Sequence, residues 1–175
     1  MAQNPSNMLH LGTKMPLFSL WDTIDSKIKK SKELIGKKGT LVFFICNHCP
    51  FVHHVIEEIT RITNDYRVQG IGFIAISSND VYKYPEDSPQ KMEEFARENR
   101  FEFPYLYDEN QEVAKSFKAA CTPDFFLFDA DNFLIYRGQI DDSRPNNGIA
   151  ISGYDIRVSI ECLLNNTKEE APKYL

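Results

Sequence analysis

The sequence predicts an α/β fold, a three-layer sandwich in which helices flank a central mixed sheet, with an N-terminal extension and a mid-chain insertion. Residues 41–45 and 70–77 are continuous apolar runs too short for typical helices, so we expect them to be buried strands of a mostly parallel sheet. A segment with helical periodicity follows each run. Residues 125–128 and 133–136 read as two strands joined by a polar turn, which predicts a hairpin.

The main helix is expected to begin near residue 51, where apolar residues start to recur at helical spacing while polar residues occupy the opposite face. The apolar set is Phe51, Val52, Val55, Ile56, Ile59 and Ile62, and the polar set is Glu57, Glu58, Arg61 and Asn64. The other expected elements are a short strand at 18–21, a weak helix or loop at 25–36, a proline-bearing loop at 82–89, a helix at 89–99, a strand at 104–108, and helices at 109–120 and 154–164.

Length and composition predict an ordinary globular protein. With 175 residues, 42% of them hydrophobic, the chain can build one core, so we expect a single domain over 1–175, with its core at about 12–164 and a frayed tail over 165–175. The net charge of −5 argues against nucleic acid as a partner. Because no apolar segment reaches the length of a signal peptide or a membrane span, we expect a cytoplasmic protein without membrane contact.

A pair of cysteines marks the junction between the first buried strand and the main helix. Cys46 follows the strand, and Cys49 lies three residues later, which is close enough for a disulfide. The first turn of a helix favours a thiolate, so we predict that Cys46 is the nucleophile, with a lowered pKa, and that Cys49 is the less exposed resolving thiol. Asn47 and His48 lie between them; a protonated His48 would stabilise the reduced pair and give it oxidising character.

Two other interpretations of this motif compete with redox chemistry. Cys46, His48, Cys49 and His53 could form part of a zinc site, although a closed site would need distant residues because no second C-x2-C or H-x3-H pair is present. Alternatively, both cysteines are small buried apolar residues. We expect no metal and no cofactor, and we expect His53 and His54 to be helix-surface or packing residues.

Cys121, Thr122 and Pro123 come directly before the strand at 125–128. Here the chain resembles the thioredoxin fold, in which such a Thr-Pro pair carries a cis-proline facing the dithiol. The resemblance implies that Cys46 is the nucleophile, that Cys49 resolves, and that the Thr122-Pro123 loop docks an extended substrate segment. Cys121 is expected to be a packing residue, with the role of a third thiol as the alternative.

Longer motifs narrow the resemblance. FICNHCPFV, NDVYKYPEDSP, CTPDFFLFDAD and YRGQIDDSRP are similar to segments of peroxiredoxin-like thioredoxin proteins of the alkyl hydroperoxide reductase and thiol-specific antioxidant superfamily. Peroxiredoxins carry a P-x3-T-x2-C pattern, whereas Gly39 and Phe43 occupy those positions before Cys46. Thioredoxins usually carry an acidic proton relay where this chain has Thr40, and a tryptophan where it has Ile45. The residue that takes the proton from the resolving thiol is therefore not identified by the motif.

The resulting hypothesis is a thiol-disulfide oxidoreductase that acts through a mixed disulfide on a disulfide- or thiol-bearing protein or small molecule and uses a thiol reductant system. The alternatives are a thiol-dependent peroxidase or antioxidant protein, and a non-catalytic redox-sensing or zinc-binding module. Four cysteines are too few for a disulfide-stapled secreted fold. Cys162 is expected in the core, and residues 141–144 (DDSR) in a solvated loop held by an Asp-Arg pair.

Overall fold

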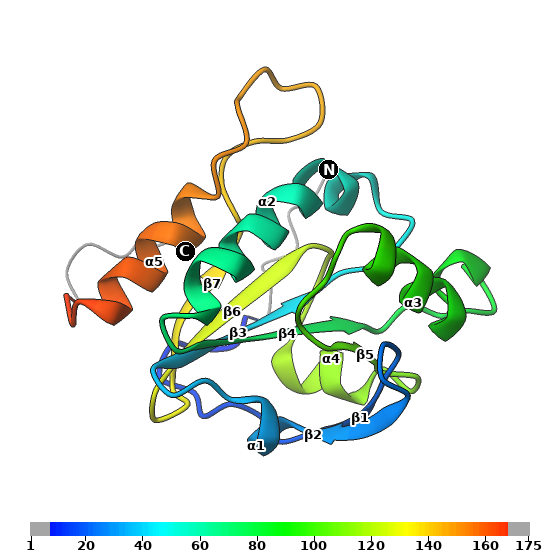
Figure 1. The fold of residues 1–175 in the computed structure, drawn as a ribbon, viewed down its shortest axis with the longest axis horizontal. Coiled ribbons are helices and arrows are strands. Elements are labelled where there is room, and N and C mark those ends of the chain that lie inside the picture. Colours follow the sequence, from blue (N-terminus) through cyan, green and yellow to red (C-terminus); the bar gives the residue numbers. More distant parts are fainter. Residues whose placement is uncertain (1–7, 168–175) are drawn as a thin grey trace.

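The structure is a computed structural model that describes residues 8–167, so residues 168–175 of the tail expected over 165–175 lie outside the described residues. A mixed sheet of seven strands runs through the molecule in the order β2-β1-β5-β4-β3-β6-β7, and helices cover both of its faces (Figure 1). The strands are β1 Ser19–Asp22, β2 Lys27–Lys30, β3 Gly39–Phe44, β4 Ile71–Ser77, β5 Tyr105–Tyr107, β6 Asp124–Asp129 and β7 Leu134–Gly138; the helices are α1 Ser31–Leu34, α2 Pro50–Arg67, α3 Pro89–Glu98, α4 Glu112–Phe117 and α5 Tyr154–Leu164.

The register of the central strands positions the predicted site. β3 pairs with β4 in parallel and with β6 antiparallel, and Phe44 lies opposite Asp124. The chain leaves β3 toward Cys46 at the same end of the sheet where Pro123 leads into β6. Two motifs that lie more than 70 residues apart in the sequence are thereby brought together, because antiparallel pairing places the end of one strand beside the start of the other.

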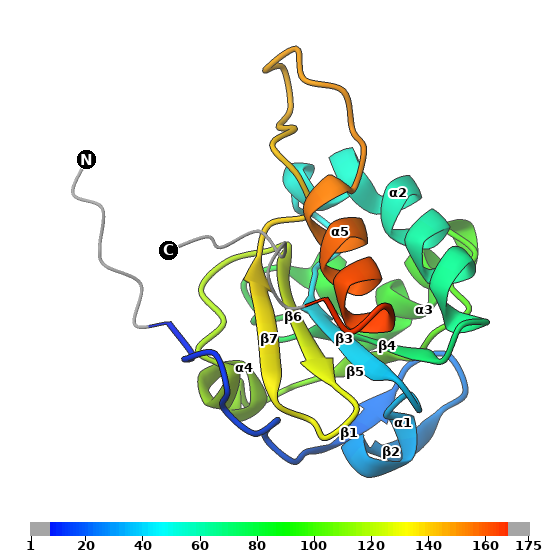
Figure 2. The ribbon, with the colours of Figure 1, turned by 90° about the vertical axis from the view of Figure 1, so that its left-hand side faces the viewer.

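Side chains of the buried strands alternate between two apolar layers, although the strands read as continuous apolar runs. Leu41 and Phe43 point to the layer covered by α2, α3 and α5, whereas Val42 and Phe44 point to a second layer. The second layer packs against Phe117 of α4 and against the N-terminal segment. Figure 2 shows α2, α3 and α5 on one side of the sheet and α4 on the other. The three-layer prediction is confirmed.

Several boundaries differ from the prediction for identifiable reasons. The weak helix or loop expected at 25–36 contains strand β2, which pairs antiparallel with β1, and the short helix α1. The helix expected at 109–120 spans only Glu112–Phe117, because Gln111 and Lys118 at its two ends adopt left-handed backbone conformations. The loop at 82–89 contains a turn of 3-10 helix, η1 Pro85–Asp87. Across the described residues, no helix is long and apolar enough to cross a bilayer.

Helix α2 is placed by its ends and by one buried ion pair. Cys49 is its N-cap residue and Pro50 its first residue, where a missing N–H costs least. Glu58, predicted to lie on the solvent face, is buried instead, because Arg157 of α5 crosses over it and its Nε donates to the Glu58 carboxylate at 2.8 Å. The polar face of α2 is therefore partly an interface with α5.

Candidate active site

The two cysteines of the motif face the same residue across the sheet end. Cys46 Sγ lies 3.4 Å from Thr122 Oγ1, and Cys49 Sγ donates to the backbone oxygen of Thr122, also at 3.4 Å. Both thiols are free, and the Thr122-Pro123 peptide bond is cis. The structure thus brings together the dithiol and the Thr-Pro loop that the sequence analysis selected.

The prediction that Cys46 is the more accessible thiol is wrong. Cys46 is only 2% exposed, whereas Cys49 is half-buried. The prediction treated both cysteines as part of the first helical turn, whereas α2 begins at Pro50, so both cysteines precede it and Cys49 is its N-cap residue. Cys46 instead continues the line of β3, where the Ile45 N–H still bonds to the β4 carbonyl of Ile76 at 3.0 Å.

The pKa of Cys46 moves in the direction opposite to the prediction. Burial raises the pKa of the Cys46 thiol to about 11; the hydrogen bond from Thr122 lowers it, and the negative charge of Asp87 raises it further. A thiol in this environment stays protonated at neutral pH unless a neighbouring base accepts its proton.

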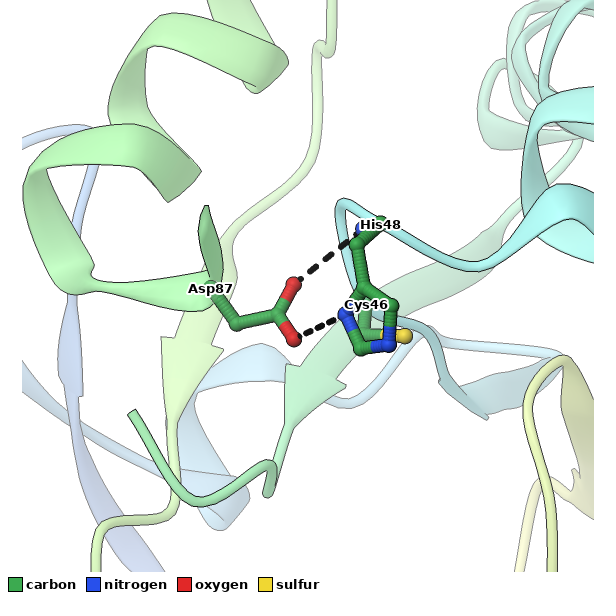
Figure 3. Close-up of side chains that lie close together, drawn as sticks. All are labelled: Cys46, His48 and Asp87. Carbon is green, nitrogen blue, oxygen red and sulfur yellow. Dashed lines mark hydrogen bonds and ion pairs between the residues drawn. The ribbon is translucent and has the colours of Figure 1, made fainter. Parts of the chain in front are cut away.

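A buried carboxylate that the motif analysis missed organises the segment between the cysteines. Asp87, in η1, is fully buried and accepts hydrogen bonds from the backbone N–H groups of Asn47 at 2.7 Å and His48 at 3.3 Å, and from Asn79 Nδ2 at 2.8 Å. Its Oδ2 also lies 2.5 Å from His48 Nδ1 (Figure 3). Asp87 lies in the polar loop at 82–89, and the sequence of such a loop does not show which residue an acidic side chain contacts.

His48 and Asn47 are held on the loop that carries Asp87. The His48 ring stacks on Tyr84 with centroids 4.5 Å apart and an interplanar angle of 12°. Asn47 donates from Nδ2 to the Glu86 carbonyl at 2.8 Å and accepts from the Tyr105 hydroxyl at 3.0 Å. Both intervening residues of the motif are therefore fixed in orientation by contacts outside it.

Cys46, His48 and Asp87 also form a group that could hold a metal ion, because one ligand atom from each lies within 4.8 Å of the others. The zinc set considered as an alternative is not assembled as such: His53 Nε2 contacts the Asn47 carbonyl at 2.5 Å. Both Asp87 oxygens already accept hydrogen bonds, so the cluster is satisfied as a hydrogen-bonded network, and we assign no metal to it.

A cavity of about 470 Å³ borders the Thr-Pro loop. Its lining includes Phe51, Cys121, Thr122, Pro123, Arg137 and Arg144. Cys121, expected to pack in the core, is exposed here, and Phe51, expected on the buried face of α2, is 48% exposed. Arg137 donates from Nη1 to the Leu9 carbonyl, whereas its Nε is buried without a partner. The cavity therefore combines apolar walls with a cationic group.

The loop after β7 is closed by a second buried carboxylate and does not contain the expected Asp-Arg pair. Asp141 accepts from the Ser143 N–H and hydroxyl, and from the N–H groups of Ser152 and Gly153 at 2.8 and 2.7 Å. Arg144 donates to backbone carbonyls rather than to the carboxylate, because the carboxylate is already filled by loop donors. Cys162 is buried in α5, as predicted.

Comparison with known proteins adds the family and the fold. Residues 11–137 match the AhpC/TSA family, whereas no curated protein matches the sequence. An uncharacterized conserved protein from Geobacillus kaustophilus is 50% identical with a TM-score of 0.93, covering 97% of this chain and 88% of that one. A hypothetical protein from Sinorhizobium meliloti 1021 is 37% identical with a TM-score of 0.91, covering 97% and 91%.

Distant solved structures share the fold alone. A secreted disulfide oxidoreductase from Mycobacterium tuberculosis is 14% identical, with a TM-score of 0.63 over 83% of this chain and 95% of that one. A thiol:disulfide interchange protein from Chlorobium tepidum, described as a DsbE, is 15% identical, with a TM-score of 0.69 over 89% and 99%.

Proposed function

The chain belongs to the AhpC/TSA family and has a thioredoxin-like fold, and we propose that it is a thiol-disulfide oxidoreductase whose redox groups are Cys46 and Cys49. The observation that carries this proposal is the contact of both sulfur atoms with Thr122, each at 3.4 Å. Two thiols that converge on one residue beside the Thr-Pro loop have the arrangement that intramolecular disulfide formation requires. The disulfide oxidoreductases that share the fold support the same reaction class.

The exposures of the two thiols indicate their order of action. The thiolate of half-buried Cys49 attacks one sulfur of a substrate disulfide and forms a mixed disulfide, while the second substrate sulfur leaves as a thiolate. Buried Cys46 then attacks the Cys49 sulfur, which forms the Cys46-Cys49 disulfide and releases the first substrate sulfur as a thiolate. The protein dithiol loses the two electrons that the substrate gains. The roles are thus the reverse of those expected from the sequence.

The Thr122-Pro123 loop and the cavity beside it are the proposed substrate site. The loop lies within hydrogen-bond reach of both sulfur atoms, so a substrate segment that docks on it brings its own sulfur to Cys49. The apolar part of the cavity, including Phe51, suits the side chains flanking that sulfur in a disulfide-bearing protein. A thiol reductant system then returns Cys46 and Cys49 to the dithiol.

The proposal is tested by equilibrating the protein in glutathione buffers of graded potential and locating alkylated thiols by mass spectrometry. Reversible gain and loss of two electrons at Cys46 and Cys49 together is the expected result. Cys162→Ser is the matched control, because this buried thiol lies in α5, away from the Thr-Pro loop. A pair that stays reduced at every potential, or that purifies with a bound metal and does not cycle, contradicts the proposal. Peroxide consumption with a thiol donor is measured alongside, as the test of peroxidase activity.

A further inference from the structure

The proposed exchange contains one step for which a proton acceptor is needed. Cys46 is buried, which raises the pKa of its thiol, and it must become a thiolate before it can attack the Cys49 sulfur. Thr40, at the position where thioredoxins usually carry an acidic relay, cannot serve, because its hydroxyl is buried in β3 and accepts the Gly36 N–H at 3.0 Å. The acceptor must therefore come from another part of the site.

We propose that His48 accepts the proton of Cys46 and that Asp87 is the positioning residue that holds the imidazole ready for this transfer. The inference rests on the proposed function, since it concerns the step that closes the Cys46-Cys49 disulfide. It assigns a base to the pair of cysteines, and it assigns a role to the loop at 82–89 that carries Asp87.

The geometry places the imidazole between an acid and a thiol. Nδ1 of His48 lies 2.5 Å from Asp87 Oδ2, and a ring nitrogen of His48 lies within 4.8 Å of the Cys46 sulfur. In Figure 3 the Asp87 carboxylate faces one edge of the ring, and the sulfur of Cys46 lies on the other side. A carboxylate that accepts from Nδ1 fixes the neutral tautomer in which Nε2 is free to accept a proton. Nucleophile, base and orienting acid are the three parts by which an activated nucleophile is recognised.

The surroundings of Asp87 suit an ionised carboxylate. Two backbone N–H groups and the Asn79 amide donate to it in addition to the imidazole, so the buried charge is compensated by four donors. Tyr84 stacks on the His48 ring and restricts its rotation. When His48 gains the proton, the imidazolium that forms is already paired with the Asp87 charge, so no unpaired charge is created in the buried site.

The step balances over Cys46, His48, Cys49 and the substrate sulfur that leaves. The Cys46 S–H bond breaks and its proton moves to His48; the sulfur electron pair then forms the bond to Cys49 Sγ. The bond between Cys49 and the substrate sulfur breaks, and the released thiolate takes up the proton from the imidazolium. In the opposite direction the same groups act in reverse order.

Within residues 8–167, other titratable groups also lie near this pair. Asp87 and Cys49 contribute to the electrostatics of Cys46, and Cys46 and Asp87 to those of the buried Tyr105 hydroxyl on β5. On the loop side, Tyr84 stacks on the ring and Lys83 lies 5.4 Å from the Tyr84 ring centroid. A histidine that serves as the base cannot accept the proton once it is itself protonated, so the closing step should slow toward acid pH.

The test measures the rate at which the Cys46-Cys49 disulfide closes after the reduced full-length protein is mixed with glutathione disulfide, at pH values from 5 to 9. Acid-quenched samples separate the mixed disulfide with glutathione from the closed disulfide by mass. His48→Gln should slow closing at pH 7 by roughly 100-fold and remove the acid limb of the wild-type pH profile, whereas Asp87→Asn should slow closing by roughly 10-fold and keep an acid limb, because His48 is still present. Asp87→Glu should restore part of the rate.

Asp108→Asn is the matched control. Asp108 is as buried as Asp87 and also accepts backbone N–H groups, those of Val113 and Ala114, but it touches no imidazole; closing should stay within about two-fold of wild type. His48→Gln leaves the Asp87 side chain and its backbone donors in place, so it decides the question if Asp87→Asn does not fold. Wild-type rates and pH profile in His48→Gln overturn the inference. Absence of any Cys46-Cys49 disulfide in the wild type overturns the proposed function instead.

Discussion

Two buried aspartates, Asp87 and Asp141, each gather the N–H groups of a neighbouring loop, yet they belong to sites of different character. Asp141 is surrounded by three backbone N–H groups and a hydroxyl, none of which changes its protonation near neutral pH. Asp87 is surrounded by two backbone N–H groups, an amide and an imidazole beside a thiol. The same carboxylate chemistry gives a structural clamp in one loop and a proton-transfer network in the other.

The difference lies in the partners rather than in the burial. Burial alone raises the pKa of Asp141, but the hydrogen bonds from Ser143, Ser152 and Gly153 outweigh it and leave the pKa below its ordinary value. A carboxylate held in this way stays charged and stabilises its loop. Asp87 differs because its partner His48 can itself take up a proton, so this carboxylate can influence proton transfer at the neighbouring thiol.

The largest expected effect comes from removing the thiol that distinguishes the Asp87 site. Cys46→Ser should abolish the Cys46-Cys49 disulfide completely and leave a mixed disulfide on Cys49 after treatment with glutathione disulfide, because the thiol proposed to release it is gone. Mass spectrometry of the intact protein and of its peptides measures this. Glutathione attached to no residue, or only to Cys121, contradicts the order of attack proposed above.

Removing the clamp of the other loop should change stability and leave the redox step intact. Asp141→Ala deprives four donors of their acceptor and should lower the free energy of unfolding by about 3 kcal/mol, measured by urea denaturation. The effect should persist down to pH 5 and shrink only below about pH 4, because an acid with a lowered folded-state pKa stabilises above its unfolded value. Asp142→Ala is the control. Slower closure of the Cys46-Cys49 disulfide with an unchanged free energy of unfolding would contradict the structural role assigned to Asp141.

A third buried aspartate, Asp124, sharpens the comparison because it has few donors. Burial raises its pKa to about 6, so the folded state binds a proton more tightly than the unfolded chain, and stability falls as the pH rises from about 4 to above 6. Asp124→Asn should therefore stabilise the protein by about 2 kcal/mol at pH 7 and have little effect at pH 4. Urea denaturation at the two pH values gives the difference; an equal effect at both contradicts the raised pKa.

The smallest expected effect is a difference in alkylation rate between the two thiols. In the reduced native protein at pH 7, iodoacetamide should modify Cys49 at least roughly 10-fold faster than Cys46, because Cys46 is buried and has a raised pKa. Peptide mass spectrometry over time measures both rates, and the unfolded protein in urea, where the rates should converge, is the control. Faster modification of Cys46 would restore the order expected from the sequence.

The parts of the fold that repeat a simple pattern could be predicted from the sequence. The continuous apolar runs became β3 and β4, and the helical spacing after Cys49 became α2. The proximity of Cys46 to Thr122 followed from a resemblance to a known fold. These features depend on local periodicity and on short motifs, which a single sequence displays directly.

The parts that depend on distant partners could not be predicted. Asp87 lies about 40 residues from His48 in the sequence, and nothing in a polar loop marks one carboxylate as the partner of that imidazole. The helical spacing placed Glu58 on the polar face of α2, which predicted exposure to solvent, but Arg157 of another helix covers it. The exposures of the two thiols depend on the path of residues 46–49 between β3 and α2, and periodicity does not define the conformation of such a connection.

The two outer strands of the sheet are protected from pairing with other chains in different ways. At one edge, β2 (KIKK) presents lysine side chains, whose charges repel a second strand of the same kind. At the other edge, the chain's own N-terminal segment lies beside the start of β7. Lys14 forms an isolated antiparallel backbone bridge with Phe133, and the Leu134 N–H donates to the Thr13 carbonyl. Both edges of the sheet are thereby less open to pairing with a strand of another chain.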